Sequence, residues 1–252
     1  MLKEIIIAIQ SYFEAHAFIS RHRLWRWILV PGILYMLLFS VGIWYFWHSS
    51  DAAIGYFSQK TGLTAWLQQE RNGLLSVLFM LATIFLQLLL LVFYFSLFKY
   101  LFLIIGSPVF AYLSEKTEAI LEGKDFPFSL KQLLHDIARG IRIALRNGLW
   151  QTVYMIALVL LSLIPLAGWV TPLVALFVES YYYGFSMLDY SLERSRMTAP
   201  ESIDYIGRHK GLAIGNGMIF YLMHLVPFLG WMLAPAYAVV AATLSLHKIK
   251  NA

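Results

Sequence analysis

The stretch from Leu74 to Ile105 contains a single charged residue, Lys99. An α-helix rises about 1.5 Å per residue, so this stretch is about 48 Å long and exceeds a membrane hydrocarbon core of about 30 Å. A soluble domain of this size cannot bury a helix that is so uniformly apolar. The sequence therefore predicts an integral membrane protein of the all-α class.

The composition supports a single membrane domain over residues 1–252. The chain is 60% hydrophobic and only 13% charged, whereas soluble chains carry about 25% charged residues. It contains no cysteine, which excludes disulfides and thiolate metal sites. The sequence also holds no nucleophile–base arrangement, phosphate loop or His-Glu-x-x-His pattern. We therefore expect no enzymatic activity, no cofactor, no metal site and no nucleic-acid partner.

A first membrane span is predicted over residues 27–47, which are uncharged and follow the basic residues Arg21, Arg23 and Arg26. The apolar stretch is longer than the core of a signal peptide, and no small-x-small cleavage site closes it, so we expect a retained span. Aromatic residues at both ends suit the membrane interface; they are Trp25, Trp27, Trp44, Tyr45 and Trp47. The second long span is expected over residues 74–105.

Two pairs of shorter apolar segments follow, within residues 149–190 and 211–246. Each pair is interrupted by nearly the same peptide, Pro-x-x-Gly-Trp, which suits a turn between two helices because proline lacks an N–H donor and glycine accepts unusual dihedrals. The apex residues are Pro165, Gly168 and Trp169 in the first pair and Pro227, Gly230 and Trp231 in the second.

The depth of these two hairpins is left open by the sequence. Each arm has about 16 residues, whereas a complete span needs about 20. Re-entrant or barely spanning hairpins are the favoured interpretation, and two ordinary hairpins with thin spans are the alternative. Irregular backbone at membrane depth must be surrounded by protein or by a water-filled cavity.

An amphipathic region is predicted over residues 107–148. Ser107 followed by Pro108 is typical of a helix start, and Gly123 is typical of a helix end. Ser129 and Gln132 resemble a capping box that opens a second helix. The apolar residues of this second helix lie along one face, and its arginines lie on another face, which suits a helix at the membrane surface. The arginines are Arg139, Arg142 and Arg146. Thr198 and Glu201 repeat the capping pattern.

The distribution of positive charge predicts the orientation. If both hairpins return to the side they left, all but two of the 19 Lys and Arg residues lie on one face. The exceptions, Lys60 and Arg71, lie in the loop around residues 48–73. Such asymmetry marks the cytoplasmic side, so both termini are expected in the cytoplasm.

Several stretches, in the same order along nearly the whole chain, resemble the CysZ sulfate permease family within the superfamily named for the etoposide-induced protein. They are residues 24–31, residues 106–118, Asp136 with Arg139, Asp189-Tyr190, Gly211-Leu212-Ala213, and Val226-Pro227 with Ala234-Pro235. The resemblance implies a helical membrane protein with two long helices and two partly penetrating hairpins. It also implies a homo-oligomer that moves sulfate across the bacterial inner membrane.

The resemblance points to an anion site before the first span, with one departure. The family pairs two adjacent arginines there, and this chain has Trp25 at the first position and Arg26 at the second. Arg23 and Arg21 are the other candidate anion ligands, because arginine forks suit a dianion such as sulfate. The alternative is that the three arginines set topology by contacting lipid headgroups.

Glu179 and Gln87 are polar residues inside apolar segments. They are candidates for lining or gating the pathway. Intramembrane polar groups face protein or water, so Glu179 either gates or repels an anion or bonds neighbouring helices. His224 is expected to be hydrogen-bonded packing, and residues 181–183, all tyrosine, to form an interface belt. Glycines 207, 211 and 215 would permit close helix approach, within one chain or between copies.

The leading functional hypothesis is an inner-membrane permease or channel for sulfate or a similar oxyanion, which supplies sulfur assimilation. The expected partners are the anion, membrane lipids and further copies of the chain. The alternative is a membrane scaffold or lipid-interacting protein that transports nothing. The missing arginine partner and the amphipathic region favour that alternative.

Overall fold

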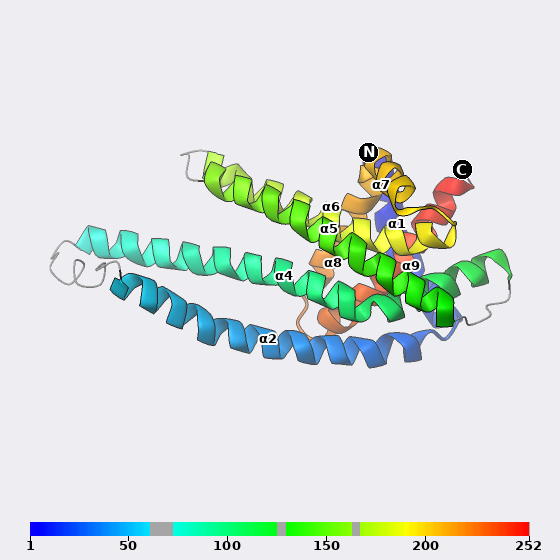
Figure 1. Cartoon of the computed structure of the whole chain (residues 1–252), viewed down its shortest axis with the longest axis horizontal. Coiled ribbons are helices and arrows are strands. Elements are labelled where there is room, and N and C mark those ends of the chain that lie inside the picture. Colours follow the sequence, from blue (N-terminus) through cyan, green and yellow to red (C-terminus); the bar gives the residue numbers. More distant parts are fainter. Residues whose placement is uncertain (61–72, 125–129, 163–166, 252) are drawn as a thin grey trace. The chain divides into compact units, whose positions relative to one another are not determined.

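The structure is a computed structural model that describes residues 1–60, 73–124, 130–162 and 167–251. These residues form eight helices and no strand, which confirms the predicted all-α class for this part of the chain. The helices are α1 (Leu2–Arg21), α2 (Trp25–Lys60), α4 (Gly73–Glu122), α5 (Leu130–Ser162), α6 (Ala167–Arg194), α7 (Ala199–Arg208), α8 (Lys210–His224) and α9 (Leu229–Lys250) (Figure 1). They belong to two compact units, Met1–Met36 with Lys99–Ala252, and Leu37–Phe98.

Two helices in the described part of the chain are long and apolar enough to cross a membrane. The first is Trp25–Ser49 within α2, and its side chains are mostly exposed. The second is Leu229–Lys250, which is α9, and its side chains are mostly buried inside the protein. The predicted span at residues 74–105 is helical, as part of α4, but most of its side chains lie outside the described residues.

The prediction that a helix begins at Ser107 is wrong, because α4 continues through this point with Pro108 in its interior. A proline inside a helix leaves the carbonyl four residues earlier without its N–H donor. Here that carbonyl belongs to Ile104, and the Ser107 hydroxyl donates to it at 2.9 Å. The serine that resembled a helix cap therefore replaces the hydrogen bond that the proline removes.

Two other helix-end predictions are confirmed. Gly123 follows the last residue of α4 with φ 64°, and the Lys124 N–H donates to the Ala119 carbonyl at 3.0 Å, as in a Schellman motif. Thr198 precedes α7, and its N–H donates to Glu201 at 2.7 Å. Ser129, the predicted cap of α5, lies outside the described residues.

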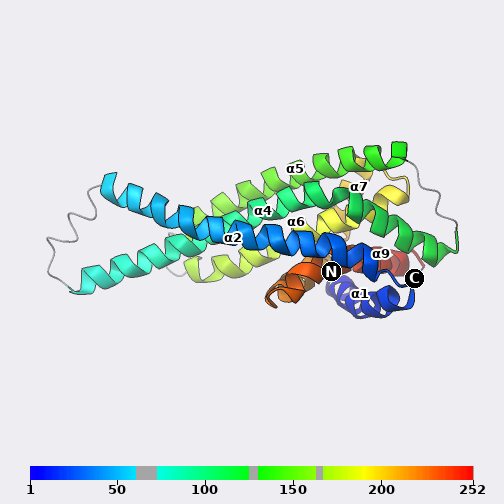
Figure 2. The same cartoon turned by 90° about the horizontal axis from the view of Figure 1, so that it is seen from below.

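The core of the larger unit is formed where α6, α8 and α9 pack together with α1 (Figures 1 and 2). Glycines permit the close crossing of α6 and α8. A Cβ added at Gly184 of α6 would overlap the Ala213 carbonyl oxygen, and one added at Gly217 of α8 would overlap the Ser180 carbonyl oxygen. The two helices therefore approach closely enough for backbone to contact backbone.

The glycines with four-residue spacing serve a second contact, between α8 and α1. Gly211 lies against the Met1 carbonyl and Gly215 against Ile5 and Ala8, whereas a Cβ added at Gly207 would meet nothing within 4 Å in the part of the chain that the structure describes. Asn216 of α8 continues this junction, because its carbonyl accepts a hydrogen bond from the Tyr12 hydroxyl at 2.8 Å. Two of the three glycines thus pack within one chain.

Two interpretations of polar faces are wrong. The tyrosine run 181–183 is not an exposed belt, because Tyr182 and Tyr183 are buried and Tyr183 stacks on Phe220 with ring centroids 3.6 Å apart. The arginine face of α5 is not wholly at the surface either. Arg142 is exposed, but Arg139 is buried.

Candidate functional site

The predicted anion ligands lie around the turn between α1 and α2. Arg23 has φ 53°, a left-handed conformation that favours glycine. The Leu24 N–H donates to the Ile19 carbonyl at 3.0 Å, and the Arg23 N–H to the Ser20 carbonyl at 3.4 Å. These are the two hydrogen bonds of a Schellman motif, so the turn that carries the arginines has a defined geometry.

The side chains of Arg21, Arg23 and Arg26 are exposed. Within the described part of the chain, no hydrogen bond or ion pair occupies their guanidinium groups. Each guanidinium carries five N–H donors that match oxyanion geometry. This turn can therefore present several free donors to an anion or to lipid phosphates.

Trp25, one residue before Arg26, packs against α9 and α1. Its ring centroid lies 6.5 Å from that of Tyr237 and 6.1 Å from that of His16. His16 in turn contacts the Tyr237 hydroxyl at 2.7 Å. Trp25 thus fixes the start of α2 on the core and supplies no charge.

Glu179 is buried and joins helices together. Its Oε2 accepts a hydrogen bond from Tyr221 of α8 at 2.7 Å, and its Oε1 accepts one from Gln151 of α5. The Tyr100 hydroxyl of α4 donates to Gln151. This hydrogen-bonded set links four helices; its members are Tyr100, Gln151, Glu179 and Tyr221. Glu179 therefore makes the contacts expected of a residue that bonds neighbouring helices, one of the two roles considered for it. Gln87 lies in α4, and its side chain is outside the described residues.

The second hairpin apex is described in detail. Gly230 lies against the Met223 carbonyl, and the Trp231 indole N–H donates to the His224 carbonyl at 3.0 Å. His224 Nε2 contacts the Tyr35 hydroxyl at 2.8 Å, which confirms hydrogen-bonded packing for this histidine. Pro227 is exposed at the turn.

The first apex lies largely outside the described part of the chain. Pro165 falls in the undescribed segment 163–166. Gly168 and Trp169 belong to the first turn of α6, but their side chains are not among those described.

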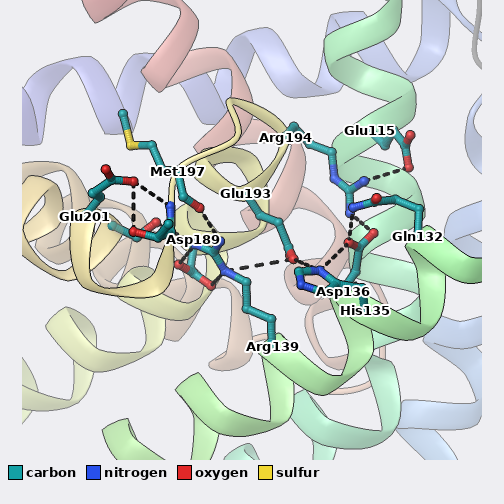
Figure 3. A network of polar contacts seen from close by, with 12 residues as sticks. Glu115, Gln132, His135, Asp136, Arg139, Asp189, Glu193, Arg194, Met197 and Glu201 are labelled. Carbon is teal, nitrogen blue, oxygen red and sulfur yellow. Dashed lines mark hydrogen bonds and ion pairs between the residues drawn. The ribbon is translucent and has the colours of Figure 1, made fainter.

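Sequence reasoning missed a buried cluster of charges between α4, α5 and α6 (Figure 3). Arg139 of α5 forms a two-point ion pair with Asp189 of α6, with Nη2–Oδ1 at 2.9 Å and Nε–Oδ2 at 3.3 Å. It also donates to the Ser202 hydroxyl at 2.6 Å and to the Met197 carbonyl. Burial lowers the pKa of Arg139, but the hydrogen bond to Asp189 and the charges of the neighbouring carboxylates together outweigh it, so the pKa is raised.

A second arginine, Arg194 of α6, completes the cluster. It pairs with Asp136 of α5, and with Glu115 of α4 at 3.1 Å. Glu193 lies between the two arginine groups, with Oε1 3.9 Å from Arg139 Nε. Burial raises the pKa of Glu193 to about 7, although Arg139 opposes the shift. Charged residues on otherwise apolar helices are the sequence signal for this cluster. The signal does not identify the partners, because the paired residues lie 50 or more positions apart in the sequence.

Comparison with known proteins places these features in a family context. A family model described as "Sulfate transporter CysZ/Etoposide-induced protein 2.4" matches residues 11–235. A Pseudomonas aeruginosa (strain LESB58) protein named "Sulfate transporter CysZ" is 29% identical over 234 residues, which cover 92% of this chain and 90% of the relative. A Pseudomonas fluorescens (strain Pf-5) protein of the same name is 29% identical over 143 residues, which cover 56% of this chain and 57% of the relative. The matched regions thus span nearly all of one relative and somewhat more than half of the other.

Proposed function

The chain belongs to the sulfate transporter CysZ/etoposide-induced protein 2.4 family, and we propose that it is a permease or channel for sulfate or a similar oxyanion in the bacterial inner membrane. The family match over residues 11–235 carries this proposal. The related P. aeruginosa protein, which matches over 92% of this chain, is named a sulfate transporter. In this role the protein would supply sulfur assimilation and would catalyse no chemical reaction.

The exposed arginines at the α1–α2 turn would attract and bind the anion at the mouth of the pathway. Guanidinium groups bind oxyanions through paired N–H donors. Arg26 holds the register of the family's second arginine, and Arg23 would replace the first, because Trp25 packs on Tyr237. The Schellman turn supports this assignment, since it holds the backbone of Arg23 in one conformation.

The proposal extends to architecture. Both hairpins would enter the membrane without completing ordinary spans, and the Pro-x-x-Gly-Trp apices would lie at membrane depth. Both termini would be cytoplasmic, and the working form would be a homo-oligomer. Glu179, held by Gln151 and Tyr221, would fix the helices around the pathway, and Gln87 would line it.

Sulfate flux into proteoliposomes tests the proposal. We expect radiolabelled sulfate to enter faster than in empty liposomes, and Arg26→Ala to slow this flux at least about tenfold, the effect of losing one charge-assisted contact of about 1.4 kcal/mol or more. Arg142→Ala, which removes an exposed arginine from α5, is the matched control and should leave the flux unchanged. Wild-type flux no greater than that of empty liposomes would reject transport.

A second variant separates the charge of Arg23 from its backbone conformation. Arg23→Gly removes the guanidinium but suits φ 53°, so the turn is expected to persist. Loss of flux with unchanged thermal stability would then assign the effect to the charge. Unchanged flux would leave Arg26 and Arg21 as the anion ligands.

A non-transporting scaffold or lipid-interacting protein is the second candidate. Trp25 in place of an arginine favours it, as do free arginines that could equally hold lipid phosphates. A deletion strain that grows normally on sulfate as its sole sulfur source, together with no flux in proteoliposomes, would support this function in place of transport.

A further inference from the structure

We propose that His135, Asp136 and Glu193 form a binding site for a divalent transition-metal cation such as Zn²⁺. One ligand atom from each residue lies within 4.8 Å of the other two. The His135 Nδ1 is 3.4 Å from Glu193 Oε1 and 3.9 Å from Asp136 Oδ1. Ligands of a tetrahedral zinc, bound at about 2.0–2.2 Å, lie about 3.4 Å apart, so side-chain adjustments would bring the three atoms to one ion. Asp136 Oδ1 accepts a hydrogen bond from Gln132 at 2.8 Å, and the ion would replace or share this contact.

A buried oxygen that accepts no hydrogen bond in the described part of the chain points into this group. The Glu193 side chain is only 4% exposed, and its Oε1 has no hydrogen-bond partner in the described part of the chain. A buried polar atom without a partner costs about 1–3 kcal/mol. In Figure 3 the Glu193 carboxylate is directed between Arg139 and His135. Arg139 does not satisfy it, since its Nε is 3.9 Å away and hydrogen-bonds to Asp189.

The charges of the cluster also favour a divalent cation. Two guanidinium groups contact four carboxylates here, and an ion bound to Glu193 would keep this carboxyl deprotonated, so the ion would face an excess of two negative charges. The members are Arg139, Arg194, Glu115, Asp136, Asp189 and Glu193. Buried charges need compensation, and one divalent cation would neutralise this excess.

The donor set selects the kind of metal. An imidazole nitrogen with two carboxylates suits Zn²⁺ and similar transition ions, whereas Ca²⁺ and Mg²⁺ prefer oxygen ligands alone. His135 is 70% exposed, so the ion would reach the site from solvent and retain water in its open position. Because His135 and Asp136 belong to α5 and Glu193 to α6, the bound ion would bridge these helices. The sequence hid the site, since its third ligand lies more than 50 residues from the first two.

Zn²⁺ titration of the purified full-length chain tests this proposal directly. The protein is prepared without a polyhistidine tag, treated with chelator and titrated by calorimetry in detergent. We expect one saturable Zn²⁺ per chain, a rise in Tm on binding, and binding of Mg²⁺ at least 100-fold weaker. Co²⁺ in place of Zn²⁺ should give a visible absorption band from a nitrogen- and oxygen-coordinated ion.

Two variants test His135 and Glu193 as ligands, and a third variant is the control. His135→Ala and Glu193→Gln should each weaken Zn²⁺ binding at least tenfold and remove the Co²⁺ band. His48→Ala, which deletes an exposed histidine outside the cluster, should bind as the wild type does. Because His135 is exposed, His135→Ala should keep the wild-type circular dichroism and elution volume. Absence of saturable Zn²⁺ binding, or wild-type affinity in folded His135→Ala, would overturn the proposal.

Discussion

The α5–α6 and α8–α9 hairpins carry nearly the same apex peptide but differ in what surrounds them. In the second hairpin, α9 is buried continuously from Ala234 to Leu246. In the first, the halves of α5 and α6 nearest the apex expose many large apolar side chains. These include Val153, Ile156, Leu161, Val170, Leu173, Leu176 and Phe177.

This difference shows that apolar composition does not by itself identify what covers a helix. The α8–α9 hairpin packs against α1 and α6 (Figures 1 and 2), so its apolar residues from Ala234 to Leu246 form a protein core, while Leu225 and Phe228 at its apex are exposed. The exposed halves of α5 and α6 need another apolar environment, and lipid provides one. The α6 helix combines both situations, since its second half is buried from Tyr182 to Glu193.

The largest effect is expected from the buried half of α6. Asp189→Ala leaves the Arg139 guanidinium without its two-point partner, and an unpaired buried charge costs about 3–5 kcal/mol. We therefore expect poor recovery of monodisperse protein and a strongly lowered Tm in detergent. Asp204→Ala, which breaks the exposed Asp204–Arg208 pair, is the control and should change stability by less than about 1 kcal/mol. Equal effects of the two substitutions would contradict the buried role of Asp189.

The crossing of the two hairpins should be the next most sensitive place. Gly217→Ala adds a Cβ that overlaps the Ser180 carbonyl oxygen, and overpacking costs about 1–3 kcal/mol. Gly55→Ala is matched in chemistry, and its added Cβ meets no atom of the described residues within 4 Å. We expect thermal unfolding to shift down for Gly217→Ala and to stay the same or rise slightly for Gly55→Ala. A tolerated Gly217→Ala would mean that α6 and α8 can separate without cost.

The apex of the second hairpin should be less sensitive. Trp231→Phe keeps an aromatic ring but loses the indole hydrogen bond to the His224 carbonyl, worth about 1 kcal/mol. The expected result is a small fall in Tm with unchanged elution volume. Trp44→Phe, at an exposed position, is the control, and a larger loss there than at Trp231 would be inconsistent with the described apex.

Local signals predict two helix ends correctly and a third wrongly, and they do not predict which helices pack together. Gly123 and Thr198 were predicted correctly because each acts on backbone groups within a few residues. The prediction at Ser107 is wrong because a serine next to a proline has two local roles. Its hydroxyl can cap the start of a helix, or it can donate to the carbonyl that lacks its N–H donor because of a proline inside a helix. Tyr183 and Arg139 were misplaced because Phe220 and Asp189, the residues that bury them, lie far away in sequence.

The candidate anion site was predictable in composition and not in conformation. The spacing of Arg21, Arg23 and Arg26 is visible in the sequence, and basic residues before a span have known roles. The left-handed backbone of Arg23 is not visible, because an arginine there gives none of the sequence signal that a glycine would. The charge cluster depends on three helices meeting, which no periodic pattern specifies.

The exposed half of α6 should be the least sensitive place in detergent. Leu173 is 58% exposed, and substitutions at such positions change stability by less than about 0.5 kcal/mol. Leu173→Ala should therefore leave Tm nearly unchanged, while Leu188→Ala, at a buried position of the same helix, should cost about 2–5 kcal/mol. Measuring both variants in detergent and in reconstituted bilayers distinguishes lipid from another copy of the chain as the cover of the exposed half of α6. If Leu173→Ala also shifts the oligomer distribution, another copy of the chain covers this surface, and the contrast between the hairpins is one of assembly rather than of lipid exposure.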